Sequence, residues 1–138
     1  MKGIILHNID LYLCDSEFKL KFDDRLTLIS GNSGSGKSIM FRAFRNKSGE
    51  DSRIECFDGI DIKKRDICKE IGQLKNKVIV IDNADSMLSL EQRAEIALDT
   101  RNQYIIISHH SEGYCPGRNS LRELMVKNNK ASLIPVMG

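Results

Sequence analysis

The feature that most constrains the fold is a glycine-rich stretch between an apolar strand pattern and an apolar helix pattern. Residues 31–38 read GNSGSGKS, preceded by RLTLIS at 25–30 and followed by IMFRAFRN. Glycine loses more backbone entropy on folding than other residues and adds no side chain to a core. Three glycines and a lysine in so short a stretch therefore indicate a strand, a binding loop and a helix in succession.

This stretch matches the pattern G-x-x-x-x-G-K-[ST] at every fixed position, in the strand and helix context that the pattern requires. In such a loop successive backbone N–H groups surround a polyphosphate, and a Cβ at the glycines would obstruct its approach. Lys37 adds a charge near the terminal phosphates, Ser38 offers a hydroxyl to Mg²⁺, and the helix N-terminus adds its dipole. A serine- and glycine-rich linker is the alternative, but a linker has no need of a lysine here. We expect a phosphate-binding loop (P-loop) formed by Gly31, Asn32, Ser33, Gly34, Ser35, Gly36, Lys37 and Ser38.

The rest of the chain alternates strand and helix patterns. Strand patterns lie at 3–14, 17–22, 25–30, 52–57, 78–82, 104–108 and 132–136, and helix patterns at 38–46, 65–74, 90–101 and 121–128. The runs VIVID and YIIIS are continuously apolar, which is typical of strands buried on both faces of a parallel sheet. Ser89 with Gln92, and Ser120 with Glu123, have capping-box spacing before the last two helices. This order predicts one α/β domain over 1–138, with helices on both faces of a mainly parallel sheet and antiparallel N-terminal strands.

Composition excludes several classes of protein. With 138 residues, 41% of them hydrophobic, the chain can bury a sizeable core without disulfides or a structural metal. No apolar run is long enough to cross a bilayer, and we read no signal peptide, so we expect a cytoplasmic protein without membrane contact. The four cysteines lack paired spacing and are expected to be reduced. A net charge of +2 does not support a nucleic-acid partner, and the basic clusters at 42–47 and 63–65 fit solvated helix faces.

Asp82 is the candidate acid for holding a metal ion. It ends the run VIVID, and ligands of open α/β sheets bind at the carboxyl ends of strands. Asp82 would therefore reach the same edge as the P-loop and hold Mg²⁺ together with Ser38. The alternative is an aspartate that only begins a turn. The run resembles the Walker B motif of P-loop ATPases.

The residue after Asp82 departs from that motif. ATP-binding-cassette and AAA-type ATPases place there a glutamate that activates the attacking water, whereas this chain has Asn83. An amide cannot accept a proton, so we expect slow or absent hydrolysis. Asp85 either replaces the missing carboxylate or caps the helix that follows.

Three further residues follow from the same resemblance. Ser108 and His109, at the end of YIIIS, resemble the γ-phosphate sensor of AAA-type ATPases and the switch histidine of cassette ATPases. The resemblance implies a contact with the terminal phosphate or the water, and a polar strand exit is the alternative. Tyr12 lies near the spacing at which cassette proteins place an adenine-stacking aromatic, or else it is an exposed residue of an edge strand.

Taken together, the motifs resemble a minimal P-loop ATPase of the additional-strand group, close to both the cassette and the AAA-type cores. The resemblance implies a three-layer P-loop NTPase fold, with ATP and Mg²⁺ as cofactors. Adenine is favoured because the chain has no N-K-x-D guanine motif. The expected function is a slow Mg-dependent ATPase that couples its nucleotide state to a protein partner, which would supply an arginine in trans. Its expected catalytic residues are Lys37, Asp82, Asp85, Ser108 and His109.

Two other functions fit the same residues. In the first, ATP orders the surrounding loops and exposes a partner surface without turnover. In the second, the chain is a small-molecule kinase whose lid uses Arg118 and Arg122, beside the irregular stretch 109–119. The sequence departs from both families that it resembles: it lacks the LSGGQ-like signature of cassette proteins, and no small helical lid domain of the AAA-type kind follows its last strand.

Overall fold

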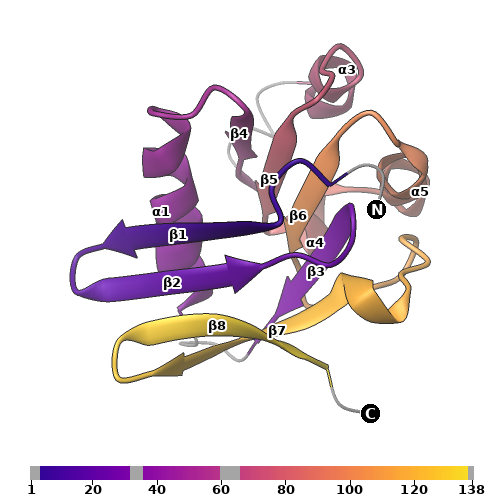
Figure 1. Cartoon of the computed structure of the whole chain (residues 1–138). Coiled ribbons are helices and arrows are strands. Elements are labelled where there is room, and N and C mark those ends of the chain that lie inside the picture. The colour runs from indigo at the N-terminus through magenta and orange to yellow at the C-terminus, as the bar shows by residue number, and fades with distance from the viewer. Residues whose placement is uncertain (1–3, 32–35, 60–65, 137–138) are drawn as a thin grey trace.

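The computed structural model describes residues 4–31, 36–59 and 66–136, which form an α/β fold around one mixed sheet (Figure 1). The strands are β1 (Asn8–Leu13), β2 (Ser16–Lys21), β3 (Leu26–Ser30), β4 (Ile54–Phe57), β5 (Val78–Asp82), β6 (Gln103–Ile107), β7 (Leu121–Lys127) and β8 (Lys130–Pro135). The helices are α1 (Lys37–Ser48), α3 (Ile67–Ile71), α4 (Ala84–Met87), α5 (Leu90–Leu98) and the short 3₁₀ helix η1 (Arg118–Ser120).

The strand order is β1-β2-β8-β7-β3-β6-β5-β4. β3 pairs in parallel with β6 and β7, and β5 pairs in parallel with β6 and β4. The predicted antiparallel pairing of the two N-terminal strands is confirmed, and β7 with β8 forms a second antiparallel pair. Because β3, β5 and β6 are parallel, their carboxyl ends lie at one edge of the sheet, with β6 between β3 and β5.

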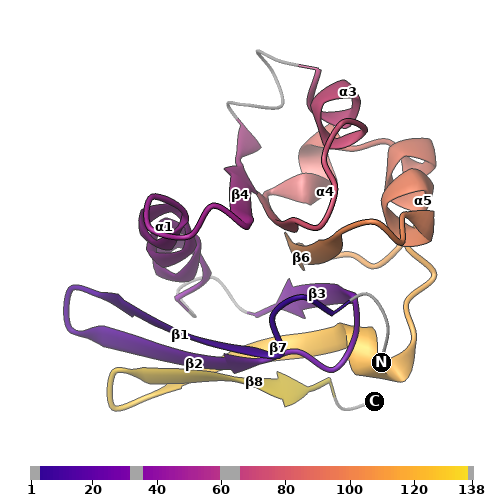
Figure 2. The same ribbon diagram turned by 45° about the horizontal axis from the view of Figure 1, so that its top comes forward.

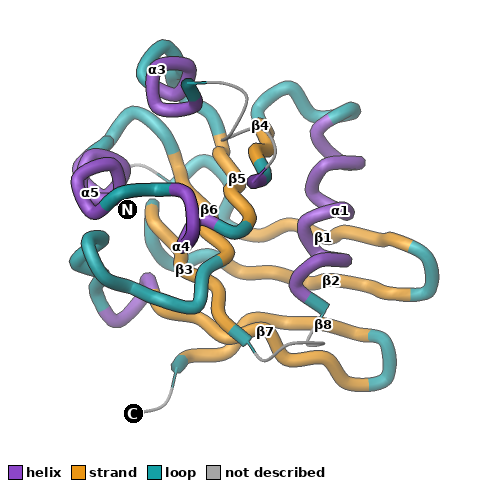
Figure 3. Tube along the Cα trace, turned by 180° about the vertical axis from the view of Figure 1, so that it is seen from behind, coloured by secondary structure: helices purple, strands orange, loops and turns teal. Residues whose placement is uncertain are grey.

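Two apolar clusters pack against opposite faces of the sheet. Met40 and Phe44 of α1 belong to one, and Ile71 of α3 and Ile96 of α5 belong to the other. Figures 2 and 3 show α1 on one side of β4, β5 and β6, with α3 and α5 on the other. With both faces covered, the residues of β5 from Val78 to Ile81 are 0% exposed, as the continuous apolar run predicts.

One predicted element is wrong: residues 121–128 do not form a helix. They form β7, which pairs with β3 through Leu28 and Leu121 and with β8 through the whole hairpin. The Ser120 hydroxyl does not cap a helix but donates to the Asp24 carboxylate at 2.8 Å. The apolar spacing of this segment fits either structure, so the strand pairing, which is distant in sequence, decides the outcome.

The strand predicted at 78–82 is present with unchanged ends, and the other predicted elements are present with shifted ends. The helix expected at 65–74 is the shorter α3, which begins where the Asp66 side chain accepts from the Lys69 amide. The predicted capping box is confirmed, because Ser89 and Gln92 each bond the backbone amide of the other. Residues 32–35 of the P-loop and the basic cluster at 63–65 lie outside the described residues.

All four cysteines lie among the described residues, and no disulfide joins any two of them. They are Cys14, Cys56, Cys68 and Cys115. In the part of the chain that the structure describes, no helix has the length and apolar character needed to span a membrane.

Candidate functional site

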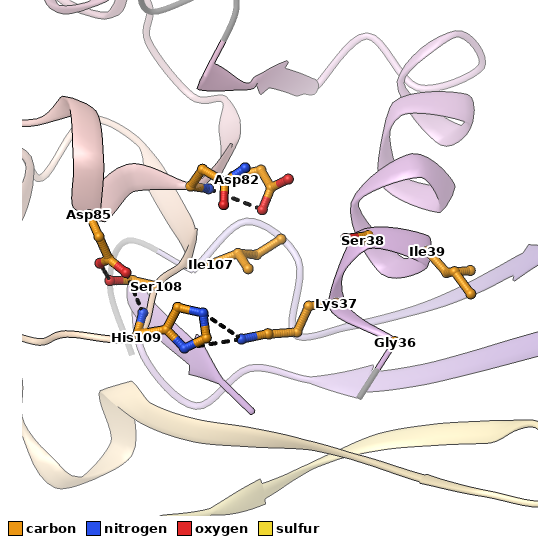
Figure 4. Close-up of a pocket in the computed structure, with 10 residues that line it drawn as sticks. Gly36, Lys37, Ser38, Ile39, Asp82, Asp85, Ile107, Ser108 and His109 are labelled. Atoms are coloured by element: carbon orange, nitrogen blue, oxygen red, sulfur yellow. Dashed lines mark hydrogen bonds between the residues drawn. The ribbon is translucent and has the colours of Figure 1, made fainter. Parts of the chain in front are cut away.

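A cavity of about 330 Å³ opens at the carboxyl edge of the parallel strands (Figure 4). Its volume lies within the range of small-molecule sites. The residues that line it come from the start of α1, the end of β5, α4 and the end of β6: Gly36, Lys37, Ser38, Ile39, Asp82, Asn83, Asp85, Ile107, Ser108 and His109. The fold thus brings seven predicted site residues to one place, from three separate segments: Gly36, Lys37, Ser38, Asp82, Asp85, Ser108 and His109.

The start of α1 is open to an anion. Gly36 has φ 98°, a left-handed conformation that side chains rarely adopt, and a Cβ there would lie 3.3 Å from Val126 Cγ2. Gly36, the N-cap residue of α1, has no side chain with which to cap the helix, and the first turn of α1 contains no acidic residue. Within that turn, the first N–H groups and the positive end of the helix dipole therefore meet no acidic side chain.

Lys37 lines the cavity from the start of α1. Its Nζ donates to the Gly31 carbonyl at 2.6 Å and lies 3.3 Å from Nε2 of His109. Because an ammonium can only donate, the His109 ring accepts in this contact. Burial lowers the pKa of Lys37, while the charges of Asp82 and Asp85 oppose that change. A partly exposed ammonium that lines a cavity is suited to attract a phosphate.

Asp82 stands at the end of β5, half-buried. Burial raises the pKa of its carboxyl group, and the N–H of Asn83, which donates to it at 3.0 Å, acts in the opposite direction. The Ser38 hydroxyl lines the same cavity from α1. A hydroxyl and a carboxylate are the oxygen ligands that Mg²⁺ takes together with waters and phosphate, so these two residues fit that ion.

Asn83 is the residue between β5 and α4. It has φ 55°, which is left-handed, and its exposed side chain lines the cavity. Asparagine tolerates this backbone conformation better than most residues. The resemblance implies a glutamate at this position. The backbone conformation there suits the asparagine that the chain has.

Asp85, in the first turn of α4, contacts the end of β6. Its carboxylate accepts the Ser108 hydroxyl and, at 2.7 Å, the N–H of His109. Burial raises the pKa of Asp85, but the hydrogen bonds from Ser108, His109 and His110 outweigh burial and lower it. A carboxylate that is held ionised by these bonds is a weak proton acceptor, and its geometry is that of a support for β6.

The two candidates for the phosphate sensor, Ser108 and His109, differ in burial and in their contacts. Ser108 is buried and its hydroxyl bonds Asp85, whereas the His109 side chain is exposed to the cavity and contacts Lys37. Of the two side chains, that of His109 is therefore the one exposed to the cavity.

Other candidates lie away from the cavity. Tyr12, on β1, is 65% exposed and lines a separate groove with the second half of α1. Arg122 is buried in an ion pair with Asp23 at 3.1 Å, and Arg118 is exposed on η1. Neither arginine lines the cavity.

Arg93 is a residue of this region that sequence reasoning missed. It is 7% exposed, and its guanidinium donates to the carbonyls of Asp85 at 2.7 Å, Leu88 at 3.1 Å and Glu112 at 3.2 Å. The available signal was a charged residue one turn before Ile96 on the buried face of the predicted helix.

Comparison with known protein families gives one match. The model of the family described as AAA domain matches residues 4–113. The matched range contains every residue that lines the cavity. A comparison with curated proteins found no match.

Proposed function

The chain belongs to the AAA domain family of nucleotide-binding, ATPase-like domains, and we propose that it binds ATP with Mg²⁺ in the cavity at the start of α1. One observation carries the proposal: the Lys37 ammonium lies in a cavity between an uncapped helix N-terminus and the Asp82 carboxylate. The helix N-terminus and the ammonium favour a phosphate, and the carboxylate favours a cation. A ligand that brings both therefore fits the cavity.

The roles of the residues follow from their places. The first amides of α1 and Lys37 would bind the phosphates, and Ser38 and Asp82 would hold Mg²⁺, which neutralises phosphate charge when bound. His109 would contact the terminal phosphate in place of its present contact with Lys37. The position of β6 between β3 and β5 supports assignment to the three-layer P-loop fold of the additional-strand group. Adenine remains our choice of base on the sequence alone.

Turnover is proposed to be slow. Asn83 cannot accept a proton, and Asp85 is engaged by Ser108 and His109. A partner that lends an arginine in trans would raise the rate. The same two observations favour the second candidate function, a nucleotide-gated binding module that holds ATP and exposes a partner surface without release.

Calorimetric titration with Mg-ATP, Mg-GTP and ATP in EDTA tests the proposal. We expect Mg-ATP to bind, and Lys37→Ala to weaken it about tenfold or more, since a charged hydrogen bond is worth about 1.5–3 kcal/mol. Lys69→Ala, which removes an exposed lysine on α3, is the matched control and should bind as the parent does. No binding by the parent, or equal affinity in Lys37→Ala, would overturn the assignment.

Phosphate release from bound Mg-ATP then separates the two candidate functions. Steady release by the purified protein favours the slow ATPase. Tight binding without release favours the gated module.

A further inference from the structure

Arg93 is a buried cation whose described hydrogen bonds all go to main-chain carbonyls. Those carbonyls belong to three different segments: Asp85 is in α4, Leu88 lies between α4 and α5, and Glu112 lies in the stretch after β6. A guanidinium has five donors in a fixed plane, so it can hold several carbonyls in one geometry. Arg93 therefore joins α4 to the chain beyond His109.

The chain beyond His109 is packed closely against Arg93. We call residues 111–117 the outer segment. Gly113 has φ +87°, and a Cβ there would lie 3.1 Å from Arg93 Cβ and 3.2 Å from the Leu90 carbonyl. The next residue, Tyr114, is 1% exposed, and the Arg93 guanidinium lies 5.8 Å from its ring centroid. The outer segment therefore cannot shift against α5 without disturbing Arg93.

The same arginine is close to the nucleotide site through Asp85. Arg93 holds the Asp85 carbonyl, and the Asp85 carboxylate holds the N–H of His109. The His109 ring in turn contacts Lys37. A continuous series of contacts thus runs from Glu112, on the exposed part of the outer segment, to the ammonium that would meet the phosphates.

We propose that Arg93 is a positioning residue that couples the outer segment to the nucleotide site, so that contacts made by the outer segment regulate the preference of the site for ATP over ADP. This inference rests on the proposed function. Because coupling of binding equilibria is reciprocal, the terminal phosphate must change the outer segment as much as the outer segment changes affinity for that phosphate.

The first test is the ratio of ADP to ATP dissociation constants, measured by calorimetry below the melting temperature of every variant. Arg93→Met should lower the ratio at least fivefold, chiefly through weaker ATP binding, while ADP affinity stays within about twofold. Arg93→Lys, which keeps the charge but not the planar donors, should give an intermediate ratio. Tyr114→Phe is the matched control, because the buried Tyr114 hydroxyl has no hydrogen-bond partner among the described residues. It should leave the ratio unchanged.

The second test needs no variant and covers the case in which Arg93→Met fails to fold. Amide hydrogen exchange in residues 111–117 of the parent protein should be slower with Mg-ATP than with Mg-ADP by at least about fivefold, the coupling factor expected in the first test.

The outcomes distinguish the two proposals. If the parent prefers ATP and folded Arg93→Met keeps the same ratio, the coupling is overturned while the nucleotide site stands. Equal exchange in both nucleotide states also overturns the coupling alone. If the parent binds neither nucleotide, the proposed function falls and this inference with it.

Discussion

The main-chain N–H of His109 donates to the Asp85 carboxylate at 2.7 Å, and this bond joins the end of β6 to the first turn of α4. The Ser108 hydroxyl donates to the same carboxylate. Charged acceptors make the stronger hydrogen bonds in proteins, so these two contacts fix the direction in which His109 leaves the strand. Each carboxylate oxygen of Asp85 therefore accepts one of these hydrogen bonds. Asp85 positions His109 and has no unbonded oxygen to present to a bound phosphate.

We predict that Asp85→Asn lowers the free energy of unfolding by about 2 kcal/mol at pH 7, since the amide replaces one acceptor oxygen by a donor. The hydrogen bonds from Ser108 and the backbone lower the folded-state pKa of Asp85 below 3.8. Its contribution is therefore complete above pH 3.8 and is lost as the pH falls through the folded-state pKa. Urea unfolding across this range measures the effect, with Asp10→Asn at an exposed position of β1 as the control. Equal stability of parent and Asp85→Asn at pH 7 would show that Asp85 does not support β6.

Asp82→Asn is predicted to raise the free energy of unfolding, whereas Asp85→Asn lowers it. Burial raises the pKa of Asp82, so the folded state carries an ionised carboxylate at a cost that the unfolded state does not have. This cost is complete at neutral pH, is relieved as the pH falls through the folded-state pKa, and disappears below 3.8, where both states are protonated. Without nucleotide, Asp82→Asn should be more stable than the parent at pH 7, and the difference should shrink in acid. The same variant should lose Mg-ATP affinity. A variant less stable than the parent at pH 7 would contradict this account of burial.

The elements predicted best from sequence are those whose pattern is set by burial or by one local interaction. The run VIVID became β5 with no change of boundary, because only a strand between two covered faces needs apolar residues at every position. α5 begins at its capping box, which is specified within four residues. β7 was missed because its partners β3 and β8 are set by topology and not by its own spacing.

The residues of the site also divide into those that a local pattern predicts and those that depend on contacts distant in sequence. Residues at strand ends, such as Asp82 and His109, follow from the parallel sheet once the strands are found. Arg93 and Glu112 meet only because α5 packs beside the chain that leaves β6, and no local pattern specifies that contact. A local signal for the turn between β7 and β8 was present in Asn128 and Asn129, because asparagine is enriched where φ is positive.

The hairpin between β7 and β8 gives a direct test of the corrected element. Asn128 and Asn129 have φ 52° and 62°, so both are left-handed, and Lys127 pairs with Lys130 across them. Alanine in this conformation is strained, so Asn128→Ala should destabilise the protein by about 1 kcal/mol in urea unfolding. A helix over 121–128 would predict the reverse, because alanine is the better helix former. Asn119→Ala, an exposed change in η1, serves as the control and should be neutral.

Asn83→Glu tests whether the amide after β5 limits turnover. The side chain of residue 83 lines the cavity, so a glutamate there would present a carboxylate able to accept a proton from water. We expect phosphate release from Mg-ATP to rise at least tenfold, since a positioned base contributes roughly 10²–10⁴ to a rate. Because residue 83 has φ 55°, the change should also cost about 1 kcal/mol of stability. Asn83→Gln carries the same backbone strain and side-chain length without the charge, so only the carboxylate distinguishes the two variants. If both release phosphate at the parent's rate while still binding Mg-ATP, the water does not lie beside residue 83, and the slow step must be sought in the support that Asp85 gives to His109.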